Sequence, residues 1–157
     1  MHSHECPGSR TIDFSRREEK PPQGEGVVQS QLRQWPIQLH LVSPGAAYFR
    51  GADLLLSADC VAYALGGFHP EHLTGKSLAI ACPKLDDGQD IYLEKIKSLL
   101  DDAQINTLTV MIMQVPCCSG LLNLAVQAVR QATRKVPVKH LVVSLQGEIL
   151  REDWVEV

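Results

Sequence analysis

The five cysteines are the residues of this sequence with the most distinctive chemistry. Cys6 lies near the N-terminus, whereas Cys60, Cys82, Cys117 and Cys118 are spread through the rest of the chain. Their odd number and wide spacing do not fit a secreted disulfide framework. Free thiols bind zinc or iron–sulfur clusters, carry out thiol redox chemistry, or pack as small apolar side chains.

Short β-rich runs alternate with helical periods from residue 37 onward. The predicted strands are Ile37–Val42, Asp53–Ala58, Ser77–Cys82, Thr107–Val115 and Lys139–Leu145, with a turn at Gln146–Glu148 leading the last strand into a short hairpin through Ile149 and Leu150. Most of these runs are apolar along nearly their whole length. Strands of this kind are buried on both faces, as in a parallel sheet.

Two amphipathic helices are predicted to cover this sheet. The first has its apolar stripe within residues 92–103, with Asp86 or Asp87 as its N-cap, and the second has its stripe within residues 121–132. The predicted fold is a three-layer α/β sandwich with a mostly parallel sheet of about five strands, of the Rossmann or flavodoxin-like kind.

The composition changes near Trp35. Before it, charged residues are frequent, and Pro21–Gly26 has the composition of a linker. Such a segment buries too little apolar surface to offset the entropy lost on ordering. We predict a flexible N-terminal arm over residues 1–35, with Leu32 and Trp35 docking on the body at its end. A single α/β domain carrying the cysteine site then spans residues 36–157.

Four cysteines lie at the carboxyl ends of predicted strands. Cys60 follows the second strand, Cys82 ends the third, and Cys117 and Cys118 follow the fourth. In a parallel sheet these ends share one edge, where open α/β folds bind their ligands. Cys117 and Cys118 also precede a helix, whose free N–H groups favour thiolate over thiol. We predict a shared metal or cluster site with these four cysteines as ligands.

Several chemistries remain open for this site. Three or four thiolates suit an iron–sulfur cluster, foremost [4Fe–4S], or a tetrahedral zinc ion. Neighbouring side chains diverge, so Cys117 and Cys118 fit separate irons of a cluster better than one zinc tetrahedron. Alternatively, the adjacent pair forms a disulfide, or one of its thiolates reacts and is resolved by Cys60 or Cys82. A partner-binding scaffold with incidental cysteines is the remaining class.

Histidines offer further ligands. His69 and His72 follow the first cysteine loop, where a helix start and a solvated turn explain them better than a metal site does. His2, His4 and Cys6 form a short cluster near the N-terminus that can bind metal adventitiously. Whether Cys6, His69 or His72 contributes a ligand stays open.

Charge and hydropathy argue against other classes of partner. The 15 basic and 18 acidic residues give a net charge of -3, so the protein has no cationic field with which to gather nucleic acid. The apolar runs are shorter than the roughly 18–20 residues that cross a bilayer, and no membrane partner is expected. The first eight residues lack the apolar core of an export signal. We therefore expect a cytoplasmic protein whose thiols remain reduced.

Five short motifs resemble a known protein family. They are Cys6–Ser9, Gln31–Pro36, Ala58–Cys60, Cys82–Asp87 and Val115–Gly120. In this order, and over nearly the whole chain, they resemble the C-terminal region of bacterial, mostly anaerobe-associated, ferredoxin-like iron–sulfur proteins. That region typically follows a ferredoxin module whose cysteine runs hold two [4Fe–4S] clusters, and this sequence lacks those runs. The family's double cysteine is typically followed by two glycines, where this chain has Ser119 and Gly120.

The resemblance implies iron–sulfur chemistry and a redox partner protein, which the sequence does not identify. We therefore expect an electron-transfer or redox accessory protein rather than a stand-alone enzyme. The chain has no glycine-rich phosphate loop and no paired carboxylates placed as a general acid and base. A homo-oligomer that shares the cluster across a subunit interface is compatible with these features.

Overall fold

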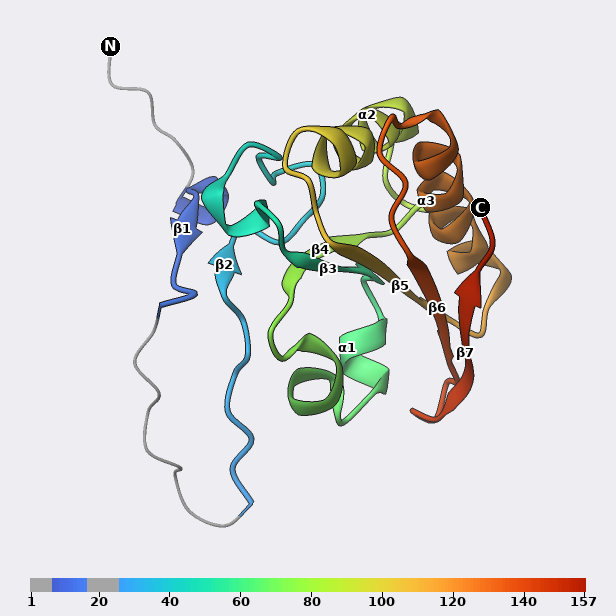
Figure 1. Cartoon of the computed structure of the whole chain (residues 1–157). Helices are drawn as coiled ribbons and strands as arrows, with labels where there is room; N and C mark the ends of the chain where they lie inside the picture. The colour runs from blue at the N-terminus through green and yellow to red at the C-terminus, as the bar shows by residue number, and fades with distance from the viewer. Residues whose placement is uncertain (1–6, 17–25) are drawn as a thin grey trace.

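The computed structural model describes residues 7–16 and 26–157. Figure 1 shows a central sheet with helices on both of its faces. The elements are η1 (Pro7–Ser9), β1 (Ile12–Asp13), β2 (Gln34–Trp35), η2 (Ala47–Phe49), β3 (Asp53–Ala58), α1 (Val61–Ala64), η3 (Phe68–Leu73), β4 (Ser77–Ala81), α2 (Gln89–Asp101), β5 (Thr107–Met113), η4 (Pro116–Cys118), α3 (Ser119–Gln131), β6 (Val138–Val143) and β7 (Ile149–Val155).

The main sheet has five strands in the order β4-β3-β5-β6-β7. The first four run parallel, and β7 pairs antiparallel with β6. All residues of β3 from Leu54 to Ala58 are buried, because this strand is covered on both faces. The predicted three-layer α/β sandwich with a mostly parallel sheet is confirmed.

Helices α2 and α3 pack side by side on one face of the sheet, and α1 and η3 lie on the other (Figure 1). The predicted apolar stripes are the buried sides of α2 and α3. The predicted N-cap of α2 was wrong. Gly88 occupies that position with a φ of +73°, a conformation that glycine adopts without strain. The side chain of Asp86 instead accepts hydrogen bonds in the loop before the helix.

The predicted strand Ile37–Val42 does not form. A single parallel bridge joins Gln38 to Ile80, after which the chain turns. Lys95 stabilises this turn, since its Nζ donates to the carbonyl oxygens of Leu39, His40 and Val42 at 3.0, 2.7 and 2.9 Å. The apolar pattern of the segment reflects core packing by Leu39 and Val42 rather than a strand.

The end of the predicted N-terminal arm packs on the body. Gln34 is fully buried, and its side chain accepts from the backbone N–H of Leu78 at 2.9 Å and donates to the carbonyl oxygen of Leu78 at 2.6 Å. Leu32 packs against the core, and the indole N–H of Trp35 donates to the carbonyl oxygen of Gly8. The arm's residues 1–6 and 17–25 lie outside the described part of the chain.

The predicted hairpin after β6 is present, and its second strand extends to Val155. Gly147 lies in the turn with a φ of +85°. A Cβ atom there would stand 2.3 Å from the carbonyl oxygen of Ala64, so the hairpin turn passes directly against the end of α1. Within the described ranges, no helix is both long and apolar enough to cross a membrane.

Replacing Gln34 by leucine should destabilise the fold, because it leaves the N–H and carbonyl groups of Leu78 buried without partners. Each unpaired group costs about 1–3 kcal/mol. Urea unfolding should therefore show a clearly lower free energy of unfolding for Gln34→Leu and little change for the exposed control Gln131→Leu. Equal stability of the two variants would contradict the role given to Gln34.

His140 should make stability depend on pH. It lies on β6 with 7% of its surface exposed, and burial holds its pKa below the usual value of the imidazole. The unfolded chain therefore binds a proton more readily below about pH 6.5, and the free energy of unfolding should fall between pH 7 and pH 5.

The variant His140→Leu should flatten this dependence in urea titrations at several pH values. A residual slope is expected from His72, whose pKa burial also lowers. An unchanged slope in His140→Leu would show that His140 is not the group responsible.

Candidate thiol site at the sheet edge

The topology brings the cysteine-bearing loops to adjacent positions. Strand β3 lies between β4 and β5 and is parallel to both, so their three carboxyl ends share one edge. Cys60 follows β3, Cys82 follows β4, and Cys117 and Cys118 follow β5. The order of strands and cysteines in the sequence predicts these positions.

The loops after β4 and β5 touch each other across the end of β3. A Cβ atom on Gly120 would lie 3.3 Å from the Cβ atom of Pro83, closer than ordinary van der Waals contact. Glycine at position 120 therefore lets the start of α3 approach the Cys82 loop. A larger residue there would push the two cysteine-bearing loops apart.

Cys117 and Cys118 lie next to each other on the turn before α3. The two thiols are in hydrogen-bond contact, and Cys60 lies close enough to influence Cys118 electrostatically. Cys60 and Cys117 are exposed, whereas Cys118 is buried. Burial, together with the neighbouring thiols, raises the pKa of Cys118 despite a hydrogen bond from the backbone at Met113. These effects oppose the stabilisation of a Cys118 thiolate that its place before α3 predicts.

Cys82 lies in a tight turn held by Asp86. The Asp86 carboxylate accepts a hydrogen bond from the backbone N–H of Cys82 at 2.9 Å and another from the hydroxyl of Tyr92. Burial and this bond to Asp86 raise the pKa of Tyr92, with Asp59 and Cys82 adding to the effect. Tyr92 is fully buried on α2, so it anchors the Cys82 loop to the helix that covers the sheet.

Asp59, next to Cys60, adds a carboxyl group to the same edge. Its Oδ1 is buried and has no hydrogen-bond partner among the described residues, although the side chain of Gln38 bonds to the carboxyl group. Burial raises the pKa of Asp59, and the charge of Asp86 raises it further. The edge therefore combines four thiols with two carboxyl groups, of which Asp86 is already bonded to Cys82 and Tyr92.

The thiols are near one another but not arranged around one point. Among the described residues, no three His, Cys, Asp or Glu side chains are close enough to hold a single metal ion. His69 is directed elsewhere, because its Nδ1 accepts the backbone N–H of Gln31 at 3.0 Å. The third candidate residue, Cys6, lies outside the described part of the chain.

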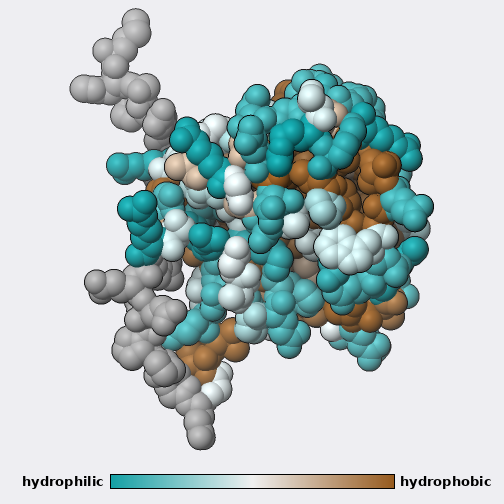
Figure 2. Space-filling model, in the orientation of Figure 1, coloured by the Kyte–Doolittle hydropathy of each residue, from teal (hydrophilic) through white to brown (hydrophobic). Residues whose placement is uncertain are grey.

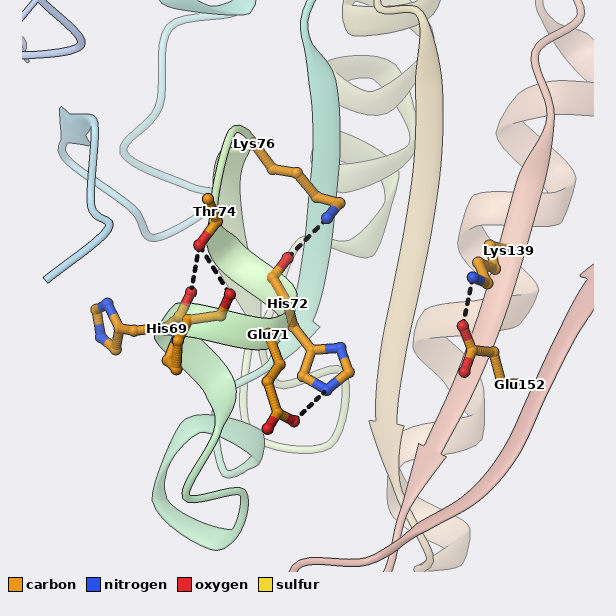
Figure 3. A network of polar contacts seen from close by, with 8 residues as sticks. His69, Glu71, His72, Thr74, Lys76, Lys139 and Glu152 are labelled. Carbon is orange, nitrogen blue, oxygen red and sulfur yellow. Dashed lines mark hydrogen bonds and ion pairs between the residues drawn. The ribbon is translucent and has the colours of Figure 1, made fainter. Parts of the chain in front are cut away.

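His72 belongs to a different feature, a polar hollow of about 570 Å³ between η3 and the strands β5 to β7. Figure 3 shows His72 and Glu71 directed toward each other on η3, with Lys139 of β6 and Glu152 of β7 forming an ion pair on the sheet. Lys76 donates to the carbonyl oxygen of His72. The charged groups of this hollow thus have partners within the protein, which makes it a weaker candidate site than the thiol edge.

Sequence reasoning missed the carboxyl group of Asp59 and the second role of Tyr92. The sequence places Asp59 directly before Cys60 at the end of a strand. This position beside a candidate ligand could have identified Asp59 as part of the site. Tyr92 fits the apolar stripe of α2, so only the structure reveals its bond to Asp86.

Comparison with known proteins places the fold in a family. Residues 46–157 match the Rossmann-like domain family. The chain is also 26% identical over 121 residues to an uncharacterized protein of Archaeoglobus fulgidus, an alignment that covers 76% of this chain and 83% of the archaeal protein. No solved structure matches the chain.

These matches correct the family predicted from the five short motifs. The family that matches is not that of the ferredoxin-like iron–sulfur proteins, and the archaeal relative carries no such description. The motif resemblance was therefore wrong as a family assignment. The match covers the whole five-stranded sheet and the helices on both of its faces, and the chain belongs to the Rossmann-like domain family.

Proposed function

We propose that the protein binds an iron–sulfur cluster, foremost [4Fe–4S], through Cys60, Cys82, Cys117 and Cys118, and serves as a redox or electron-transfer accessory protein. The observation that carries this proposal is the placement of four thiols on the loops after three adjacent parallel strands. Ligands at such an edge are held by rigid strands while their loops adjust to what they bind.

The spread of the thiols favours a cluster over a single zinc ion. A cluster takes its thiolates on separate irons, whereas a structural zinc draws four ligands to one atom. Cys117 and Cys118 are neighbours on one short turn, and each can attach to its own iron of a cluster.

The surroundings of the thiols fit transfer of electrons to a partner protein. Cys60 and Cys117 are exposed, so a cluster bound there would lie near the surface. Large apolar side chains that follow strands at the same edge also face solvent: Tyr63 on α1 is 95% exposed, and on the loops Leu85 is 81% and Leu145 68% exposed. Exposed apolar groups around a site are typical of docking surfaces. A reducing compartment such as the cytoplasm, which keeps these thiols free, is part of the proposal.

Anaerobic reconstitution with iron and sulfide tests the cluster. We expect brown protein with visible charge-transfer absorption and about four irons per chain, as a [4Fe–4S] cluster requires. Replacing Cys60, Cys82, Cys117 or Cys118 singly by serine should reduce bound iron and the visible absorption, since a hydroxyl is a poor substitute for a thiolate.

Cys6→Ser is the matched control, because that cysteine is not among the proposed ligands, and it should retain the full spectrum. Colourless protein without iron after anaerobic handling would remove the cluster proposal. About one zinc per chain that is lost in Cys82→Ser would instead support a structural zinc site.

A second candidate is thiol redox chemistry, favoured by the hydrogen-bond contact between Cys117 and Cys118. In this reaction the Cys117 thiolate attacks a small disulfide and releases one thiol. The Cys118 thiolate then displaces the second thiol and closes the Cys117–Cys118 disulfide. Overall, two protein thiols lose two electrons and two protons, and the small disulfide is reduced to two thiols.

Treatment of metal-free protein with oxidised glutathione separates this candidate from the cluster. If the pair is redox-active, peptide mass spectrometry should show a Cys117–Cys118 disulfide, and Cys118→Ser should stop at the glutathione adduct on exposed Cys117. The matched variant Cys82→Ser should still form the disulfide. Recovery of Cys117 and Cys118 as free thiols under these conditions would exclude the thiol redox function.

A further inference from the structure

The two outer strands of the sheet differ in whether their outer edges are covered. The outer edge of β4 is covered by the chain itself, through the bridge from Gln38 to Ile80 and the side-chain bonds of Gln34 to Leu78. Strand β7 is the opposite end of the sheet, and no described strand pairs with its outer side. Its outward N–H and carbonyl groups are therefore free to pair with another strand.

Strand β7 is also uncovered on its faces. Of its seven residues, six are exposed and Val155 is half-buried. Large apolar side chains are among them: Ile149 is 36% exposed, Leu150 50% and Trp154 63%. Figure 2 shows apolar surface on the side of the molecule where β7 and α3 lie, interrupted by hydrophilic side chains. An open strand with exposed apolar residues is a surface for β-strand addition.

The order of residues in β7 makes the strand complementary to itself. In an antiparallel pair, opposite residues point to the same face, so a two-fold symmetric pair must place one residue opposite its own copy. With Glu152 at that position, Arg151 faces the Asp153 of the second copy, and the reverse contact forms as well. Opposite charges directly across a strand pair are stabilising.

This register applies to the regular stretch from Arg151 to Val155. A β-bulge precedes that stretch, because Leu150 is an extra residue between Arg151, which pairs with Val142, and Ile149, which pairs with Val143. Moving the centre by one residue in either direction destroys the match of opposite charges. A centre at Arg151 places two arginines opposite each other, whereas a centre at Asp153 opposes two aspartates and sets Glu152 against Trp154.

The two Glu152 residues at the centre are supplied with counter-charges. In each copy, Lys139 of β6 forms an ion pair with Glu152 on the same face of the sheet, as Figure 3 shows, and its Nζ lies 5.6 Å from the centre of the Trp154 ring. Leu141 lies directly across β6 from Glu152 and Lys139 lies across from Trp154, so each lysine reaches its glutamate diagonally. The two glutamates face each other at the centre, each with the lysine of its own copy as a counter-charge.

We propose that β7 is a homodimer interface, in which two copies pair antiparallel about Glu152 into one continuous ten-stranded sheet. The two-fold axis stands perpendicular to the sheet and reverses the strand direction. The thiol edges of the two copies therefore lie at opposite edges of the joined sheet. The interface is independent of the thiol site, and it excludes a cluster shared between subunits across β7.

Charge reversal at two positions tests the register. In a homodimer of Arg151→Asp, an aspartate at position 151 faces Asp153 of the other copy in both contacts. In a homodimer of Asp153→Arg, two arginines face each other in the same way. Each variant alone should therefore self-associate at least tenfold more weakly than the unchanged protein. Mixed together, the two variants should form a heterodimer, because every contact between positions 151 and 153 is again a pair of opposite charges. Sedimentation equilibrium at low ionic strength measures all three samples.

Mixing the two variants distinguishes a contact between copies from a contact within one strand. Arg151 also bonds to Asp153 within one strand at 2.5 Å, so either single change removes that contact too. If only this internal contact mattered, the mixture would stay as monomeric as its components, and that result would overturn the proposal.

The double variant Arg151→Asp with Asp153→Arg preserves the internal pair and the complementarity, and it should dimerise like the original chain. Circular dichroism confirms that each variant is folded. A monomeric unchanged protein at high concentration would equally overturn the interface, whatever the result at the thiol site.

Discussion

The burial of β3 on both faces is the constraint from which the rest of the structure follows. Leu54, Leu55 and Leu56 are 1% exposed or less, so this strand must lie inside the sheet with helices above and below it. Parallel neighbours on both sides then require crossover connections, which α1 with η3 and α2 supply. The same arrangement sets the end of β3 between the ends of β4 and β5. The nearness of the three cysteine-bearing loops is thus a consequence of core packing.

Much of the sheet could be predicted from the sequence because its strands are continuous apolar runs. The exception is Ile37–Val42, where an equally apolar pattern forms a turn, since three carbonyl groups there are bonded by Lys95 from a distant helix. Contacts between residues so far apart in the sequence leave no pattern in the local sequence. The approach of Gly120 to Pro83 and the bond between Asp86 and Tyr92 are hidden for the same reason.

The candidate site could be placed from strand order alone, and its placement does not depend on the family assignment that was corrected. Local electrostatics were harder to foresee. The position of Cys118 before a helix favours a thiolate, whereas burial and the neighbouring thiols raise the pKa of Cys118. Metal binding replaces the proton of a ligand thiol, so a thiol with a raised pKa can still be a ligand.

The hydrogen exchange of one backbone amide in the sheet, that of Leu78, depends on the side chain of Gln34. The N–H of Leu78 bonds to the side chain of a residue 44 positions earlier in the chain, not to a neighbouring strand. Amide hydrogen exchange reports the opening of whichever group protects the amide. Exchange at Leu78 therefore follows the lifting of the N-terminal segment from the body, even while the strand that carries Leu78 remains paired with β3.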